Sequence, residues 1–275
     1  MRRKWVTYIA VYAFMAFVFL FFVLPLVWLI LSAFDPEATI EFKIPRAVTL
    51  KHFTELIKPV GTVTPITWIV NSIVISVATA TLVTILSILG GYSLTRYKFK
   101  GQEAMITTFV VLRLVPTIVI AIPIVMLYAQ IGFLDTYHGL ILVLTGFILP
   151  FTLLIAESYF RSLPIVYEEA AMIDGCTRFQ AFMKVTLPLA IPGIATIWLL
   201  AFVISWGEFL IPLVVMRTPD MYPASVGIYF WFGVYGRVEY GRISAFSIVY
   251  SIPIIIAFLF VQKYLRRGIA GLVTR

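Results

Sequence analysis

Three ionisable residues stand within long apolar stretches of this chain: Arg113, Glu157 and Glu208. A charged side chain in hydrocarbon costs free energy, so such residues usually face a partner, a water-filled path or another helix. An ion pair between Arg113 and Glu157 is one alternative, and separate contacts with water or headgroups are the other. For Glu208 we favour a contact that ties helices together over a place in a transport path.

A second group of candidate residues lies in a polar segment at about residues 161–190, where the chain reads EEAAMIDGCTRFQAFMKVTLPLAIP. Asp174 and Gly175 predict the end of one short helix, because glycine adopts the left-handed conformation of helix ends. Thr177, with Gln180 three residues later, forms a capping-box pattern that predicts the start of a second helix. Such a pair of helices either docks a partner or rests on lipid as an interfacial amphipathic element.

The composition indicates a membrane protein. Hydrophobic residues make up 61% and charged residues 12% of the chain, against about half and about a quarter in soluble domains. The net charge of +8 comes from basic residues scattered at the ends of apolar stretches, which favours membrane topology over nucleic-acid binding. The single Cys176 excludes an internal disulfide framework.

Six apolar stretches reach the roughly 20 residues that a helix needs to cross a bilayer. The first follows a basic start but is too long for a signal peptide, so we expect an uncleaved anchor. The sequence therefore predicts an all-α polytopic membrane protein with six transmembrane helices, forming a single transmembrane domain over residues 1–275. The six predicted spans are about 5–33, 66–93, 104–129, 138–160, 191–215 and 243–264.

Lys and Arg residues predict the orientation. Of the 21 in the chain, thirteen fall on the side that holds both termini and the 161–190 segment, seven fall on the other side, and Arg113 lies within a span. The positive-inside rule then places both termini and this segment in the cytoplasm of a multi-pass cell-membrane protein.

Sequence motifs for catalysis are missing. The phosphate-binding pattern Gly-x4-Gly-Lys-Ser/Thr does not occur, so we expect any ATP to be handled by another chain. An integral membrane enzyme is an alternative, but His52 and His138 are far apart and no Asp-rich metal motif is present. A secondary transporter is the other alternative, although internal repeats are not apparent. We expect no catalytic residue, metal or cofactor in this chain.

The 161–190 segment resembles the EAA loop of permease subunits in ATP-binding-cassette (ABC) importers, in its carbohydrate-importer form. Glu-Ala-Ala is followed after three residues by glycine and, twelve positions later, by Leu-Pro. The stretches around Tyr92 and Arg96 and at Trp206–Phe209 are similar to the same binding-protein-dependent transport family, although Gly207 replaces the usual Asn. The length and the Gly-rich tail resemble the shorter, MalG-type permease. The matching loop residues are Glu169, Ala170, Ala171, Asp174, Gly175, Leu187 and Pro188.

The resemblance implies a MetI-like permease fold and a role for this loop as the coupling helix that seats on an ATPase subunit. It implies a machine with a second, MalF-type permease subunit, two ATPase subunits and an extracytoplasmic sugar-binding protein, all working at the lipid membrane. This chain would form half of the path for sugar uptake, with a maltose- or trehalose-like oligosaccharide as the expected cargo. Nucleic acid is not expected as a partner.

Overall fold

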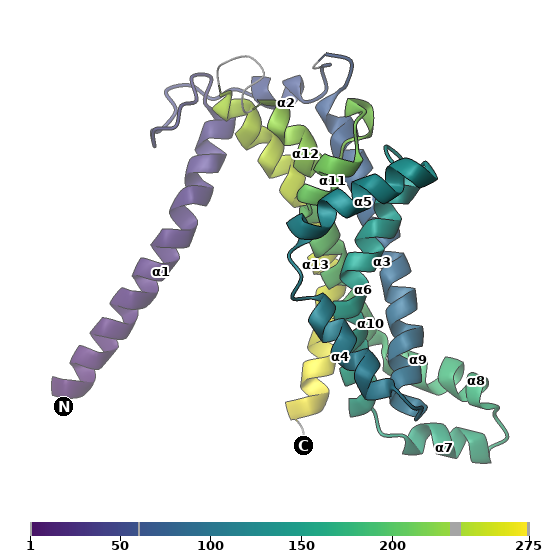
Figure 1. Cartoon of the computed structure of the whole chain (residues 1–275). Coiled ribbons are helices and arrows are strands. Elements are labelled where there is room, and N and C mark those ends of the chain that lie inside the picture. Colours follow the sequence, from purple (N-terminus) through teal and green to yellow (C-terminus); the bar gives the residue numbers. More distant parts are fainter. Residues whose placement is uncertain (1, 60, 232–237, 274–275) are drawn as a thin grey trace. The chain divides into compact units, whose positions relative to one another are not determined.

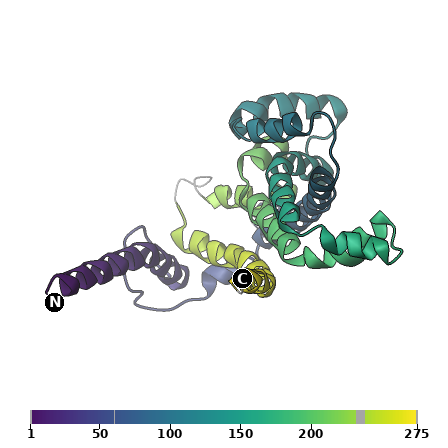
Figure 2. The ribbon, with the colours of Figure 1, turned by 90° about the horizontal axis from the view of Figure 1, so that it is seen from below.

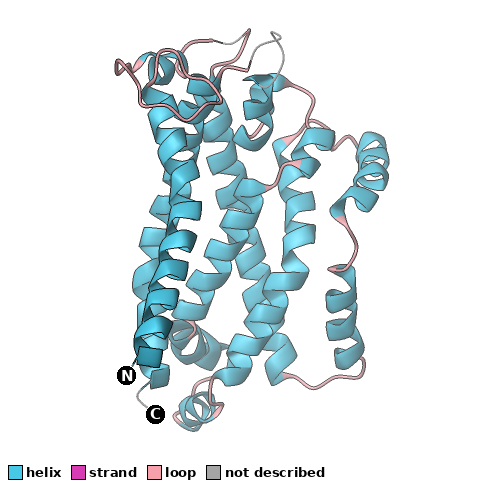
Figure 3. Ribbon diagram, turned by 90° about the vertical axis from the view of Figure 1, so that its left-hand side faces the viewer, coloured by secondary structure: helices cyan, strands magenta, loops and turns pink. Residues whose placement is uncertain are grey.

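The computed structural model describes residues 2–59, 61–231 and 238–273, and the regular elements in these ranges are helices (Figure 3). The chain divides into two units. The first comprises Met1–Ile66 with Ile228–Ile252, and the second comprises Thr67–Gly227 with Pro253–Arg275.

The first unit contains α1 (Arg2–Phe34), α2 (Lys51–Glu55), η3 (Ile228–Trp231) and the first part of α13 (Tyr240–Val273). Its loops are fixed by polar contacts. Arg242 Nε lies 2.6 Å from Glu55 Oε2, and His52 Nε2 lies 2.9 Å from the carbonyl oxygen of Asp35.

The second unit is built around α6 (Tyr137–Ser162), which packs against α10 (Ile191–Gly207) and α4 (Gln102–Leu112). Figure 1 shows α3 running beside α6. Gly91 permits this approach, because an added Cβ there would lie 2.6 Å from the Cβ of Ala156. The remaining elements of this unit are α3 (Pro65–Arg96), α5 (Thr117–Ile131), α7 (Val166–Ile173), α8 (Arg178–Ala181), η1 (Phe182–Thr186), α9 (Leu187–Leu189), α11 (Leu210–Val215), η2 (Pro219–Met221) and α12 (Ala224–Gly227).

The prediction of a helical, multi-span membrane protein is confirmed. Four helices of the described chain are long and apolar enough to cross a membrane, and two bent helix pairs raise the number to as many as six. The predicted spans 104–129 and 191–215 are not single helices, however. The first is divided into α4 and α5, which are bent by 99° (Figure 1). The second stops at Gly207 before α11 begins.

The backbone is extended at both breaks. Pro116 has extended backbone angles (φ −61°, ψ 133°) before α5, and it lacks the N–H that a continuous helix would need. Glu208 is likewise extended (φ −69°, ψ 127°) after α10. A third bend, of 72°, separates the helical run Arg178–Leu189 from α10.

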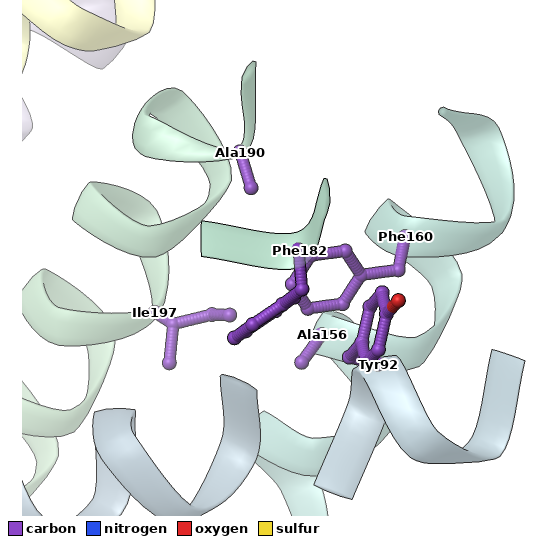
Figure 4. Packing of buried hydrophobic residues seen from close by; sticks show 6 residues of the cluster. All are labelled: Tyr92, Ala156, Phe160, Phe182, Ala190 and Ile197. Atoms are coloured by element: carbon purple, nitrogen blue, oxygen red, sulfur yellow. The ribbon is translucent and has the colours of Figure 1, made fainter. Parts of the chain in front are cut away.

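A hydrophobic cluster lies where α3, α6, η1 and α10 meet (Figure 4). The ring centroid of Tyr92 lies 4.4 Å from that of Phe182 and 5.8 Å from that of Phe160. The cluster therefore holds η1 against the long helices of the second unit. Its buried members are Tyr92, Ala156, Phe160, Phe182, Ala190 and Ile197.

A polar network fixes the chain after α11. The buried side-chain amide of Asn71 donates to the carbonyl oxygens of Asp220 and Tyr222, at 2.8 and 3.0 Å. Asp135, at a positive φ of 55°, accepts hydrogen bonds through Oδ1 from the backbone N–H groups of Arg217 and Thr218. The connection between α5 and α6 is thereby tied to the segment that follows α11.

Candidate functional site: the EAA segment

The first half of the EAA segment, residues 161–190, is the helix α7. It begins at Val166, so Glu168 and Glu169 both lie in its first turn, where the helix dipole favours acidic side chains. Figure 2, seen from below, shows α7 and α8 extending sideways from the neighbouring long helices of the second unit.

The turn predicted at Asp174 and Gly175 is present. Gly175 N–H donates to Met172 O at 3.1 Å, and Cys176 N–H donates to Ala171 O at 3.0 Å. This is the hydrogen-bond pattern of a Schellman motif, with Gly175 in the left-handed conformation at φ 93°. An added Cβ at Gly175 would meet no atom within 4 Å. The backbone angle alone therefore calls for glycine.

The predicted capping box is also present. Gln180 N–H donates to Thr177 Oγ1 at 3.3 Å, and Thr177 N–H donates to Gln180 Oε1 at 2.9 Å. These bonds start α8, which continues through the π-helical turn η1 into α9. The two halves of the segment are thus helix, sharp turn and helix, as the sequence predicts.

The two neighbouring glutamates of α7 have different surroundings. Glu168 is only 5% exposed. Its Oε1 accepts from Arg96 Nε at 2.8 Å, and its Oε2 accepts from the hydroxyl of Tyr92 at 3.0 Å. Arg96 Nη2 also donates to Leu163 O at 3.1 Å. We call Tyr92, Arg96 and Glu168 the loop anchor, because they join α7 to the end of α3.

The sequence analysis did not predict this role of Glu168. The available signal was the spacing of Tyr92 and Arg96, which lie four residues apart and so share one face of α3. The ring of Tyr97 adds a second link, since the guanidinium carbon of Arg178 in α8 lies 5.3 Å from its centroid.

The residues predicted to dock a partner separate by exposure. Glu169, Ala170, Asp174, Gly175 and Pro188 are exposed. Ala171 and Leu187 are half-buried, and Leu187 packs against the hydrophobic cluster.

Apolar side chains accompany the exposed acids. Val166, Glu169 and Ile173 are spaced at three and four residues, so they share one stripe of α7. All three are exposed, and Ile173 is 86% exposed. Beyond the turn, Phe179 of α8 is 70% exposed. An apolar surface of this kind, beside acids and small alanines, is suited to contact with another protein.

The structure does not pair Arg113 with Glu157, which was one of the two alternatives for these residues. Glu157 is buried and forms an ion pair with Arg161, one turn further along α6, instead of with Arg113. The guanidinium carbon of Arg113 lies 3.7 Å above the ring of Phe151. Arg161 lies one helical turn from Glu157 on the same helix, whereas Arg113 lies on another segment, at the break between α4 and α5. Arg161 is therefore the nearer partner for Glu157.

Glu208 accepts hydrogen bonds at the break between α10 and α11. Its Oε1 accepts from the backbone N–H groups of Leu210 and Ile211, at 3.1 and 3.2 Å, at the start of α11. Its backbone carbonyl accepts from Ser225 Oγ at 2.7 Å. Glu208 also lines a cavity of about 210 Å³, and Arg113 lines the same cavity. That these two residues share one cavity was not predicted from the sequence.

Comparison with known proteins identifies the family. Residues 84–271 match the family described as binding-protein-dependent transport system inner membrane component. The chain is 33% identical to the arabinooligosaccharides transport system permease protein AraQ of Halalkalibacterium halodurans, over 94% of this chain and 92% of that protein. It is 32% identical to the trehalose transport system permease protein SugB of Mycobacterium tuberculosis, over 90% of each.

A solved structure supports the fold. One chain in the crystal structure of a bacterial ABC transporter involved in the import of the acidic polysaccharide alginate has a TM-score of 0.82 with this chain. The two are 21% identical, and the match covers 96% of this chain and 98% of the other. The family match covers more than half of the chain, and the resemblance read from the EAA segment is therefore confirmed. This chain belongs to the family of binding-protein-dependent transport system inner membrane components.

Proposed function

We propose that this protein is the permease subunit of an ABC importer and forms half of the membrane path for a sugar or oligosaccharide. The names of its relatives support this proposal, since they include permeases for arabinooligosaccharides, diacetylchitobiose and trehalose. A trehalose- or maltose-like oligosaccharide is the proposed cargo. In this proposal residues 1–275 act as one permease domain, because both units contribute helices that can cross a membrane.

The proposed partners are a second permease of the MalF type, two ATPase subunits and an extracytoplasmic sugar-binding protein. A solved ABC transporter of similar fold is in complex with an alginate pentasaccharide-bound periplasmic protein, which supports the last of these. ATP hydrolysis belongs to the separate ATPase chains. The distribution of Lys and Arg supports a cytoplasmic position for both termini and for the EAA segment.

We propose that the exposed surface of α7 and α8 docks an ATPase subunit. The observation that carries this proposal is the different exposure of the two neighbouring glutamates of α7. Glu168 is buried in the loop anchor, whereas Glu169 is exposed beside Ala170 and Ile173. The loop anchor holds one side of α7 against the end of α3. The exposed stripe of α7 that contains Glu169 and Ile173 lies on another side of the helix and is available to a partner. Small Ala170 lets a partner backbone approach closely, and the Glu169 carboxylate suits a basic group on that partner.

The same contacts suggest how movement of the ATPase would reach the membrane. α7 is joined to α3 through Arg96 and Glu168, while η1 is packed against α3, α6 and α10 through Phe182. Packed elements of this kind move as units and do not deform continuously. A displacement of the EAA segment would therefore be passed to α3 and α10 together.

The test is ATP-driven uptake in vesicles that contain both permeases, the ATPase subunits and the binding protein. Glu169→Lys is expected to abolish uptake while the amount of permease in the membrane stays normal. Glu103→Lys, which reverses another exposed acid in α4, is the matched control and should transport normally. Near-normal uptake by Glu169→Lys would contradict the docking role. Uptake that continues without ATP or ATPase subunits would favour the secondary-transporter alternative.

A further inference from the structure

We infer that the cavity shared by Arg113 and Glu208 is a binding subsite for one uncharged, hydroxyl-rich sugar ring on its way through the membrane. This inference rests on the proposed function and deepens it. It assigns a specific contact with the cargo to this subunit, at a place away from the EAA segment.

Two breaks in the helices meet at this cavity. Arg113 lies at the break between α4 and α5, and Glu208 lies at the break between α10 and α11. Irregular backbone at membrane depth is tolerated where it is buried in protein or lines a water-filled cavity. An ionisable side chain at such depth usually marks a path for a substrate or ion. The two helix breaks, with Arg113 and Glu208, belong to different predicted spans and line the same cavity.

The hydrogen-bonding capacity of the two charged groups is only partly used. Glu208 Oε1 accepts two backbone N–H groups, whereas Oε2 has no hydrogen-bond partner within the described ranges. The guanidinium of Arg113 rests on the Phe151 ring, and its N–H groups likewise have no acceptor among the described residues. The cavity therefore offers several N–H donors and a carboxylate acceptor to a ligand.

This combination suits a sugar. Each hydroxyl group of a sugar both donates and accepts hydrogen bonds, so it can use the guanidinium and the carboxylate at once. Phe147 and Phe151 also line the cavity and provide apolar ring surface for the C–H face of a pyranose. One positive and one negative side chain leave the pair neutral, which favours an uncharged sugar over an acidic one.

The size of the cavity limits the ligand. Its volume of about 210 Å³ lies below the range of roughly 300–1,000 Å³ that is typical for drug-sized ligands. We therefore assign it to one ring of a longer oligosaccharide, with the remaining rings held elsewhere along the path.

The first test uses Glu208→Gln in the reconstituted importer. Glutamine keeps a side-chain oxygen to accept from Leu210 and Ile211, so the start of α11 keeps its cap while the charge is removed. We test trehalose, maltose, diacetylchitobiose and arabinooligosaccharides. We expect maximal uptake of whichever of them the unaltered importer carries to fall about tenfold. ATPase activity stimulated by the loaded binding protein should persist. Glu103→Gln, at an exposed acid outside the cavity, should leave both measurements unchanged.

The second test does not depend on altering either charged residue. Thr117 lines the cavity, and Thr117→Cys, in a Cys176→Ala background, introduces a thiol of similar size. The transported sugar is expected to slow labelling of this thiol by a small methanethiosulfonate reagent about fivefold or more, while a sugar that is not transported should have no effect.

The two tests separate the inference from the proposal on which it rests. Sugar protection of Thr117→Cys together with reduced uptake by Glu208→Gln supports the subsite. Should Glu208→Gln fail to assemble, the thiol measurement alone decides. Unchanged labelling in the presence of transported sugar would overturn the subsite while leaving the importer role intact. If the unaltered importer moves none of these sugars, maltose included, both the inference and the proposed cargo fail.

Discussion

Arg96 Nε at the end of α3 lies 2.8 Å from Glu168 Oε1 in the first turn of α7, and each side chain is only 7% exposed. Glu168 has a second partner in the hydroxyl of Tyr92. Removing one member of a buried ion pair leaves the other charged and without compensation, which costs more than the loss of a surface pair. The Arg96–Glu168 ion pair therefore fixes the position of α7 relative to α3.

Glu168→Ala is expected to destabilise the attachment of α7 by about 3–5 kcal/mol, because the Arg96 guanidinium would stay buried without its carboxylate. Limited proteolysis of the permease in detergent should then cut within residues 161–190 much faster than in the unaltered protein. Sugar uptake should be lost. Glu169→Ala, next in the chain but exposed, is the control and should resist proteolysis normally.

A charge exchange sharpens this prediction. The double variant Arg96→Glu with Glu168→Arg restores opposite charges across the same contact, so we expect it to recover part of the protease resistance that each single variant loses. If the double variant is no better than the worse single variant, the ion pair does not hold α7 in place.

Replacement of Gly175 should act through backbone conformation. Its φ of 93° disfavours residues with a Cβ, while the space around it is open. Gly175→Ala is therefore expected to cost about 1–2 kcal/mol and to lower the midpoint of thermal unfolding. Gly175→Asn should cost less, because Asn tolerates the left-handed region.

The matched control for Gly175 is Gly146→Ala. Gly146 also has open space around its Cβ position, but it lies within α6 and its φ is not positive. Alanine there should be neutral or slightly stabilising. Equal losses of stability for Gly175→Ala and Gly146→Ala would show that the turn does not need its left-handed glycine.

Asp135 predicts a dependence of stability on pH. Burial opposes its ionisation, but hydrogen bonds from the Thr218 hydroxyl and from the N–H groups of Arg217 and Thr218 outweigh burial and lower its pKa. A lowered folded-state pKa stabilises the fold above the unfolded pKa of about 3.9, and this contribution is lost as the pH falls through the folded pKa.

Thermal unfolding in detergent at several pH values checks this effect. Asp135→Asn should melt at a lower temperature than the unaltered protein at pH 6–7, and the difference should shrink as the pH is lowered below about 4. A difference that is the same at every pH would mean that the charge of Asp135 contributes nothing.

The orientation of the chain gives a further prediction. In a Cys176→Ala background, a cysteine at the exposed Lys184 should react with an impermeant thiol reagent only from the cytoplasmic side, and one at the exposed Thr62 only from outside. The thirteen-to-seven distribution of basic residues is the reason. Reaction of both cysteines from the same side would contradict three crossings between these positions.

Much of the architecture follows from local sequence patterns. Apolar length marks the spans, because hydrocarbon must be crossed by residues that tolerate it. The capping box at Thr177 and Gln180 and the turn at Gly175 involve only near neighbours, so their hydrogen bonds were predictable one by one.

The breaks in the spans were harder to predict. Pro25, Pro123, Pro150 and Pro253 all lie inside continuous helices, whereas Pro116 lies at a break, directly before the start of α5. Neighbouring helices satisfy the groups that a proline leaves unbonded in a membrane, so proline alone does not mark a break. The environment of the neighbouring helices decides the outcome, and it is a property of the tertiary structure.

The roles of the charged residues depend on the tertiary structure in the same way. Glu168 and Glu169 are indistinguishable in type and adjacent in sequence, yet only Glu168 meets Arg96. Arg113 and Glu208 are nearly a hundred residues apart and share a cavity only because α4, α6 and α10 pack together. Such long-range contacts carry no signature in a single sequence.

The most direct test of the central claim is co-purification of the ATPase subunits with a permease in which Ile173 and Phe179, both strongly exposed, are replaced by Glu. We predict that the double variant reaches the membrane in normal amount but no longer retains the ATPase. Ile44→Glu, at an equally exposed apolar residue of the first unit, should retain it. Full retention of the ATPase by the double variant, with normal sugar uptake, would contradict the assignment of the EAA segment as its docking surface.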